Sequence, residues 1–271
     1  MSSGLTSQHQ GDDVNTNGQS SDVLLSLSAH ELRTSLSVVK WYTEMLLDGD
    51  CGTLQDDQVK YLKTIQSSNQ KAINLIRSTL NVSRLNLGTF SVLPEEIELP
   101  SVLKQVLTDV KEKEKKKGVT VKESYENNAS GKISLDRQIC LVILRNLISN
   151  AILFSKEKGT VRISVKEGKQ GQELGTHTLR EDSLVVEIAD QGIGIPEKDK
   201  KDIFTKLFCR GSNVIDESSK GVGLGLYITK LILDKTQGEI WFTSTQDLGS
   251  TFYVAFPISG MQKKDGRTRL D

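Results

Sequence analysis

The sequence predicts an α+β protein in which an N-terminal antiparallel helical hairpin is followed by an α/β sandwich domain. Over residues 22–90, apolar side chains recur at heptad spacing, which is typical of helices packed in a bundle. Over residues 91–259, short β-prone runs and helical stretches intermingle, which is typical of a layered α/β domain. Residues 1–21 are polar and aperiodic, so we expect them to be disordered, and residues 260–271 to form a flexible tail.

The composition limits the class of protein. The 271 residues are enough for about two domains. The 35 basic and 35 acidic residues cancel, so bulk charge predicts no nucleic-acid partner. Three widely spaced cysteines form neither a disulfide framework nor a zinc motif, which favours a reducing, cytoplasmic setting. No apolar run approaches the ~20 residues of a membrane span, so membrane contact would come only through segments absent from this chain.

Two long helices are expected from about Asp22 to Leu47 and from about Leu54 to Asn86, joined by the turn DGDCGT. The apolar seam of the first helix comprises Leu25, Ala29, Leu32, Leu36, Val39, Thr43 and Leu46. A single hairpin buries such a seam poorly, whereas two hairpins from two chains bury it in a four-helix bundle. We therefore expect a homodimer formed through the hairpin.

One histidine stands off this seam. His30 lies two residues before Leu32, so it is expected to face outward, beside Glu31. Exposed polar residues are the norm on a helix. The position alone therefore leaves two interpretations open, an ordinary solvated residue or a reactive one.

The second domain is expected to contain three helices and a set of strands. The expected helices cover residues 100–117, 137–154 and 224–238. The expected strands cover residues 119–125, 132–135, 160–168, 183–190, 239–245 and 250–258. The polar stretch between residues 169 and 182 is expected to be a hairpin loop.

Three stretches of this domain carry residues suited to nucleotide chemistry. Asp190 ends a strand in DQGIGIP, where its carboxylate could accept a hydrogen bond from an exocyclic amine. The glycines of KGVGLGL, residues 220–226, lead into a helix whose N-terminus suits phosphates. Asn146 and Asn150 are four apart on one helix face, and an amide oxygen is a suitable ligand for Mg²⁺. Each stretch alone is a weak signal, and none fits a Walker loop or a dinucleotide fingerprint.

Two further motifs complete the set, HELRTSL (30–36) and IFTKLFCRG (203–211). The five motifs follow one another along the chain in the order HELRTSL, the Asn146–Asn150 stretch, DQGIGIP, IFTKLFCRG and KGVGLGL. Over about residues 22–258, the chain resembles the cytoplasmic core of a bacterial two-component sensor histidine kinase. The resemblance implies a dimerisation and histidine phosphotransfer hairpin followed by an ATP-binding domain of the Bergerat type. It implies autophosphorylation of His30 with ATP and Mg²⁺, then transfer of the phosphoryl group to an aspartate of a response regulator receiver domain, with possible dephosphorylation of that receiver.

The resemblance also assigns roles to single residues. It implies catalytic roles for His30, Glu31, Thr34 and Arg210, and Mg²⁺ binding by Asn150. It implies nucleotide binding by Asn146, Asn150, Phe154, Asp190, Gly192, Gly194, Ile195, Lys206, Phe208, Gly221, Gly223, Leu224, Gly225 and Leu226.

Two positions depart from the family pattern. Ser35 stands where the family usually has proline, and Leu153 stands where it usually has lysine. Lys156, Lys206 and Lys220 are the candidates to supply the missing cation. The departures leave open a catalytically weakened phosphatase or a dimeric scaffold for the response regulator. A further alternative is another Bergerat-type ATPase, which the hairpin with His30 argues against.

Overall fold

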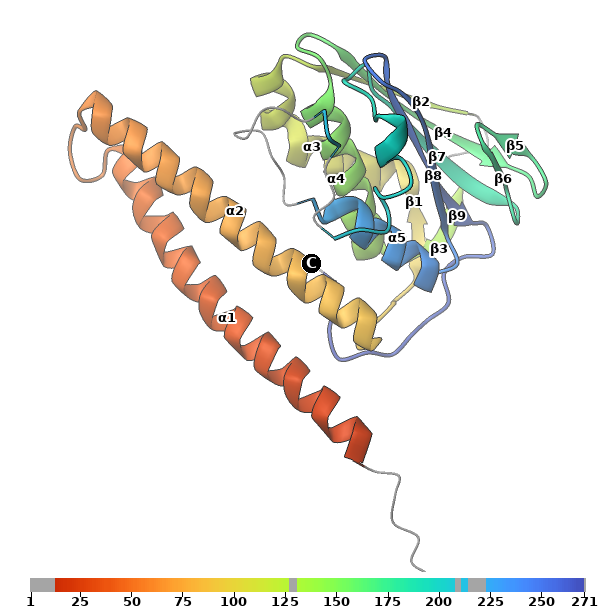
Figure 1. The fold of residues 1–271 in the computed structure, drawn as a ribbon, viewed down its shortest axis with the longest axis horizontal. Helices are drawn as coiled ribbons and strands as arrows, with labels where there is room; N and C mark the ends of the chain where they lie inside the picture. Colours follow the sequence, from red (N-terminus) through yellow and green to blue (C-terminus); the bar gives the residue numbers. More distant parts are fainter. Residues whose placement is uncertain (1–12, 127–130, 208–210, 214–222, 271) are drawn as a thin grey trace, which may run out of the picture. The chain divides into compact units, whose positions relative to one another are not determined.

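The computed structural model of the protein describes residues 13–126, 131–207, 211–213 and 223–270. The chain divides into two compact units, Met1–Leu87 and Gly88–Asp271. Figure 1 shows their elements, a helical pair in the first unit and a layered helix-and-sheet unit after it. The predicted fold class is confirmed.

The first unit is an antiparallel pair of helices, α1 (Asp13–Asp48) and α2 (Asp56–Leu87). α1 begins earlier than the expected start at Asp22, so residues 13–21, which we expected to be disordered, are helical. The two helices make extensive contact with each other, and their buried side chains include Ala29, Thr43, Asn69, Ile73 and Leu80. The amide of Asn69 donates from α2 to the carbonyl of Leu36 in α1 at 2.8 Å, which ties the two helices together.

α1 runs unbroken past Ser35. The Ser35 hydroxyl donates to the Glu31 carbonyl at 3.1 Å, a bond back along the helix by one turn. A proline at this position would remove that donor together with the backbone N–H. The serine is therefore compatible with a continuous helix in the segment that carries His30.

The second unit contains thirteen elements among its described residues. They are β1 (Glu95–Glu98), α3 (Leu99–Lys117), β2 (Thr120–Tyr125), β3 (Lys132–Leu135), α4 (Arg137–Phe154), β4 (Thr160–Gly168), β5 (Glu173–Leu174), β6 (His177–Thr178), β7 (Ser183–Ala189), η1 (Glu197–Asp199), α5 (Gly225–Lys235), β8 (Glu239–Thr245) and β9 (Gly249–Pro257). The main sheet has five strands in the order β2-β4-β7-β9-β8. β2 and β4 are parallel and the other neighbours are antiparallel.

Two small sheets were not expected. β1 pairs with β3, and β5 pairs with β6 inside the stretch expected to be a hairpin loop. The β5–β6 hairpin covers a small apolar cluster on the main sheet that contains Leu179, Val185 and Trp241.

α4 is the central helix of the unit, and it packs against α3, α5 and β7 (Figure 1). Ten of its residues are buried, which is why its sequence reads as almost continuously apolar. By length and composition alone α4 could cross a membrane, but in this fold it is a core helix of the sandwich.

The C-terminal segment differs from the flexible tail expected for residues 260–271. Val92 and Lys264 exchange backbone hydrogen bonds of 2.8 and 3.0 Å, and Ser91 N–H donates to the Thr268 carbonyl at 2.9 Å. Phe90 and Leu270 are almost completely buried. The last described residues are therefore paired with the first residues of the unit.

Candidate functional site

The site is centred on the one face of α4 that is not buried. Its partly exposed residues recur at helical spacing and form a strip made up of Arg145, Asn146, Ser149, Asn150, Leu153 and Phe154. The helix begins at Asp136, whose carboxylate accepts hydrogen bonds from the backbone N–H groups of Gln138 (2.9 Å) and Ile139 (3.1 Å). The side chains opposite the strip pack in the core, so α4 presents this strip from a fixed position.

The N-terminus of α5 lies along one edge of the strip. The Asn146 amide donates to the Gly225 carbonyl at 3.3 Å and lies 3.4 Å from the Thr229 hydroxyl. Leu224 precedes α5 without a side-chain cap. The Leu224 side chain therefore does not occupy the first N–H groups of α5, and the helix dipole favours a phosphate there.

The loop after β7 holds Asp190 as a partly buried carboxylate. Its Oδ1 accepts hydrogen bonds from Gly192 N–H at 2.8 Å and Ser250 N–H at 3.3 Å. Burial raises the pKa of Asp190 to about 6, and the two N–H donors oppose that rise. Asp190 is therefore mainly ionised at neutral pH, although it is partly removed from water.

Gly192 and Gly194 of this loop lie so close to neighbouring backbone that neither position has room for a side chain. A Cβ on Gly192 would lie 2.2 Å from the Phe154 carbonyl oxygen. A Cβ on Gly194, which has φ +60°, would lie 2.1 Å from the Thr245 carbonyl oxygen. Ile195 N–H donates to the Ser244 hydroxyl at 2.8 Å, which fixes the loop against β8.

The loop and the strip meet at the C-terminal end of α4. Ile193 N–H donates to the Phe154 carbonyl at 3.2 Å, and Ser155 and Gly192 form an isolated antiparallel β-bridge. Asn213, which the sequence analysis did not single out, donates to the carbonyls of Ile193 (3.2 Å) and Gly194 (3.1 Å). The fold thus brings α4, the Asp190 loop and the N-terminus of α5 to one place, as a nucleotide site needs.

The remaining predicted residues lie on α1, in the segment after η1, before α5, or outside the described residues. On α1, Glu31 and Thr34 are exposed. In the segment after η1, the Lys206 ammonium forms an ion pair with the Asp202 carboxylate at 2.8 Å. Gly223 has φ +75° just before α5, where Leu224 is buried and Leu226 partly buried. The His30 side chain, the side chains of Phe208 and Arg210, and Gly221 lie outside the described part of the protein.

Asn150 fits a role in Mg²⁺ binding. Its amide makes no hydrogen bond to another described residue, so its oxygen is available to a ligand. Within the described ranges no cluster of three or more His, Cys, Asp or Glu side chains could hold a metal by itself. A metal ion at Asn150 would therefore need oxygen ligands from phosphates and water, which is the coordination that Mg²⁺ prefers.

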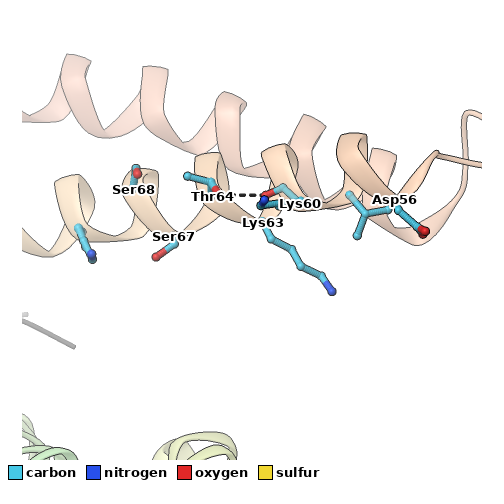
Figure 2. A pocket seen from close by; sticks show the side chains of 8 residues that line it. Asp56, Lys60, Lys63, Thr64, Ser67 and Ser68 are labelled. Carbon is cyan, nitrogen blue, oxygen red and sulfur yellow. Dashed lines mark hydrogen bonds between the residues drawn. The ribbon is translucent and has the colours of Figure 1, made fainter. Parts of the chain in front are cut away.

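A separate depression runs along α2 (Figure 2). Its lining consists of Asp56, Val59, Lys60, Lys63, Thr64, Ser67, Ser68 and Lys71. The Thr64 hydroxyl donates to the Lys60 carbonyl at 2.9 Å, a bond within the helix. The depression contains none of the predicted nucleotide-binding residues, so we place the candidate nucleotide site in the second unit.

A helical hairpin that carries His30 on α1, joined to a unit with a nucleotide-type site, is the arrangement expected of a phosphotransfer protein with its own ATP-binding domain. Residues 20–88 match the His Kinase A (phospho-acceptor) domain. Residues 136–260 match the histidine kinase-, DNA gyrase B- and HSP90-like ATPase family. The chain therefore belongs to the histidine kinase family.

Individual proteins support this assignment. The chain is 31% identical over 235 residues to the circadian input-output histidine kinase CikA of Synechococcus elongatus, covering 86% of the chain and 29% of the relative. It is 30% identical over 233 residues to the signal transduction histidine-protein kinase BarA of Escherichia coli, covering 86% of the chain and 24% of the relative. The chain thus spans less than a third of these relatives.

Two solved structures share the fold. Full-length ShkA in complex with AMPPNP superposes with a TM-score of 0.68 at 20% identity, over 90% of this chain and 47% of that one. The histidine kinase AdeS of Acinetobacter baumannii superposes with a TM-score of 0.56 at 20% identity, over 84% of this chain and 98% of that one.

Proposed function

We propose that the protein autophosphorylates His30 with ATP and passes the phosphoryl group to an aspartate of a response regulator. The observation that carries this proposal is the convergence of the α4 strip, the Asp190 loop and the α5 N-terminus in the second unit. The first unit supplies an acceptor histidine on α1, within the segment that matches the phospho-acceptor domain.

Each part of the nucleotide has a matching group. The ionised Asp190 accepts a hydrogen bond from the adenine amine, with Phe154 near the ring. The first N–H groups of α5, which Leu224 does not cap, and the glycines before the helix bind phosphates. Asn150, with Asn146 beside it, would hold Mg²⁺, which would supply positive charge to neutralise the phosphates.

The chemical step is in-line transfer to the imidazole. An imidazole nitrogen of His30 forms a bond to the γ-phosphorus while the bond from that phosphorus to the bridging β–γ oxygen breaks, and ADP leaves. Glu31 accepts the imidazole proton and stabilises the charge that develops. Arg210 stabilises the transferring group, because such reactions depend mainly on charge and positioning.

The hairpin has two further roles in this proposal. Leu32 is 53% exposed and Val39 41% exposed on the single chain, although both belong to the predicted seam. A second copy of the hairpin would cover them, as expected for a homodimer. Trp41 follows His30 by eleven residues, three turns along α1, and is 57% exposed, which supports the proposal that it contacts a receiver domain docked at His30.

The proposal also concerns location. We infer that this catalytic core works in the cytoplasm, alone or as the cytoplasmic portion of a membrane-bound sensor, because its three widely spaced cysteines form no disulfide framework. The relatives it matches extend well beyond the region it covers.

Incubation with γ-labelled ATP and Mg²⁺ tests the proposal. We expect acid-labile label on the protein that is lost in His30→Gln, while ATP affinity and dimer mass remain unchanged. Label that persists in His30→Gln would refute the assignment of His30. Free phosphate without labelled protein would indicate an ATPase instead.

One observation favours a second candidate function. Leu153 places an aliphatic side chain in the α4 strip at the position where the family usually has lysine. A weakened kinase that acts mainly as a phosphatase or a dimeric scaffold for its response regulator fits this departure. It would bind the regulator and speed loss of its aspartyl phosphate, yet take up little label from ATP.

A further inference from the structure

Lys113 of α3 reaches the edge of the α4 strip opposite the Asn146–α5 contact. Its ammonium donates to the Ser149 hydroxyl at 3.2 Å. Ser149 directly precedes Asn150 and lies one turn before Leu153 on the partly exposed strip. One turn earlier, Arg145 is bound to α3 through Asp109 at 2.5 Å. The strip therefore has an α5 edge at Asn146 and an α3 edge at Ser149.

The charge environment of Lys113 differs from that of its neighbours. Lys111 pairs with Glu114 at 2.8 Å, and Lys115 pairs with Glu112 at 3.7 Å. Within the part of the chain that the structure describes, Lys113 pairs with no carboxylate, and its partner is a neutral hydroxyl. Loss of hydration at α4, and secondarily the charge of Arg145, lower the Lys113 pKa, although much of the side chain stays exposed. An anion at this edge would offset both effects, because it favours the charged ammonium.

Two other lysines considered for the phosphates are already engaged. The Lys156 ammonium donates to the Asp247 carbonyl at 2.8 Å. Lys206 is paired with Asp202 at 2.8 Å. Leu153 carries no charge, and Lys220 lies outside the described residues. Among the described residues, Lys113 and Arg145 are the cations with a recorded bond at the α3 edge of the strip, and Arg145 is neutralised by Asp109.

We propose that the Lys113 ammonium binds the phosphates of ATP from the α3 edge of the strip, in place of a cation at position 153. The proposal rests on the proposed function, because it requires phosphates beside Asn150. Lysine is suited to this role because its ammonium can turn from the Ser149 hydroxyl to a phosphate oxygen at the end of a flexible stem. α3 would then contribute to nucleotide binding across α4.

Titration calorimetry of the full chain with ATP and ADP tests the proposal. Lys113→Met should weaken ATP binding about three- to fivefold, the size expected for a partly exposed ion pair, and should weaken ADP binding less. Lys111→Met and Lys115→Met are matched controls on the same helix and should leave the affinity unchanged. Lys113→Arg should keep most of the affinity, and melting temperatures should show that every variant is folded.

A double-mutant cycle with Leu153→Lys makes the test specific. A lysine at position 153 should restore ATP affinity in the Lys113→Met protein, and should strengthen it less when Lys113 is present. Equal affinities for Lys113→Met and the two controls would overturn the proposal, and so would additive effects of Lys113→Met and Leu153→Lys. If the unchanged protein binds no ATP, the proposed function fails first and this inference with it.

Discussion

Replacing Asp190 with asparagine should make the ATP-binding unit more stable while it loses nucleotide affinity. Burial holds the pKa of this carboxyl at about 6 in the folded protein, against an ordinary value of 3.8. The protonated form is thus favoured by folding. Its stabilising contribution is complete below about pH 4 and is lost as the pH rises towards 6. At pH 7.5 the ionised group therefore destabilises the native state.

The magnitude follows from the two pKa values. The difference between 3.8 and about 6 corresponds to at most about 3 kcal/mol at pH 7.5. Partial exposure of Asp190 reduces this figure, so we expect roughly 1–3 kcal/mol. Asparagine keeps an Oδ1 acceptor for the Gly192 and Ser250 N–H groups, so those bonds need not be lost. Its NH₂ group would oppose the adenine amine donor to donor, which should weaken ATP binding about tenfold or more.

Urea unfolding followed by tryptophan fluorescence measures the effect. In a Trp41→Phe background the remaining tryptophan is Trp241, which is buried in the second unit and reports on it alone. The gain from Asp190→Asn should be largest at pH 7.5, shrink below pH 6 and vanish near pH 4. A loss of stability at pH 7.5, or a gain that does not change with pH, would refute the reasoning.

Three further predictions concern single residues. Thr34→Ala should impair dephosphorylation of the response regulator and spare autophosphorylation, because Thr34 lies one turn from His30 and is suited to position the attacking water. Equal loss of both activities would contradict this prediction. Ser35→Pro should lower the melting temperature and reduce the free energy of unfolding by about 3 kcal/mol, because it removes helical donors to the Glu31 carbonyl. A melting temperature as high as that of the unchanged protein would argue against a continuous α1. Gly194→Ala should destabilise the second unit and weaken ATP binding, because its Cβ would meet the Thr245 carbonyl at 2.1 Å. Gly171→Ala is the control, since it has φ +80° and open surroundings and should show only the conformational cost of about 1–2 kcal/mol.

The sequence predicted the parts of the fold that have a local signal. α4 is nearly continuously apolar and begins at the capping residue Asp136, so its limits agree closely with those expected. The motif spacing also predicted that Asn146 and Asn150 share a face of this helix. Such features depend on residues a few positions apart, and the pattern of side chains records them directly.

Long-range contacts had no such signal. Lys113 and Ser149 come from different helices, and Lys113 lies in a run of alternating lysines and glutamates, residues 111–115, where no local pattern distinguishes it. The β5 and β6 strands have two residues each, too few for an alternating pattern. His177 belongs to the stretch expected to be a hairpin loop, and its imidazole lies 2.7 Å from the Glu239 carboxylate and stacks on Trp241, contacts set by tertiary packing alone.

The pairing of residues 89–92 with residues 264–268 means that the chain enters and leaves the ATP-binding unit at one spot. Neighbouring termini make a unit suitable for circular permutation and for insertion into other proteins. A domain attached behind Asp271 would accordingly emerge beside the segment that follows α2. A protein shortened at residue 260, where the family match ends, would expose Phe90 and Val92 and leave the Val92 N–H without the Lys264 carbonyl.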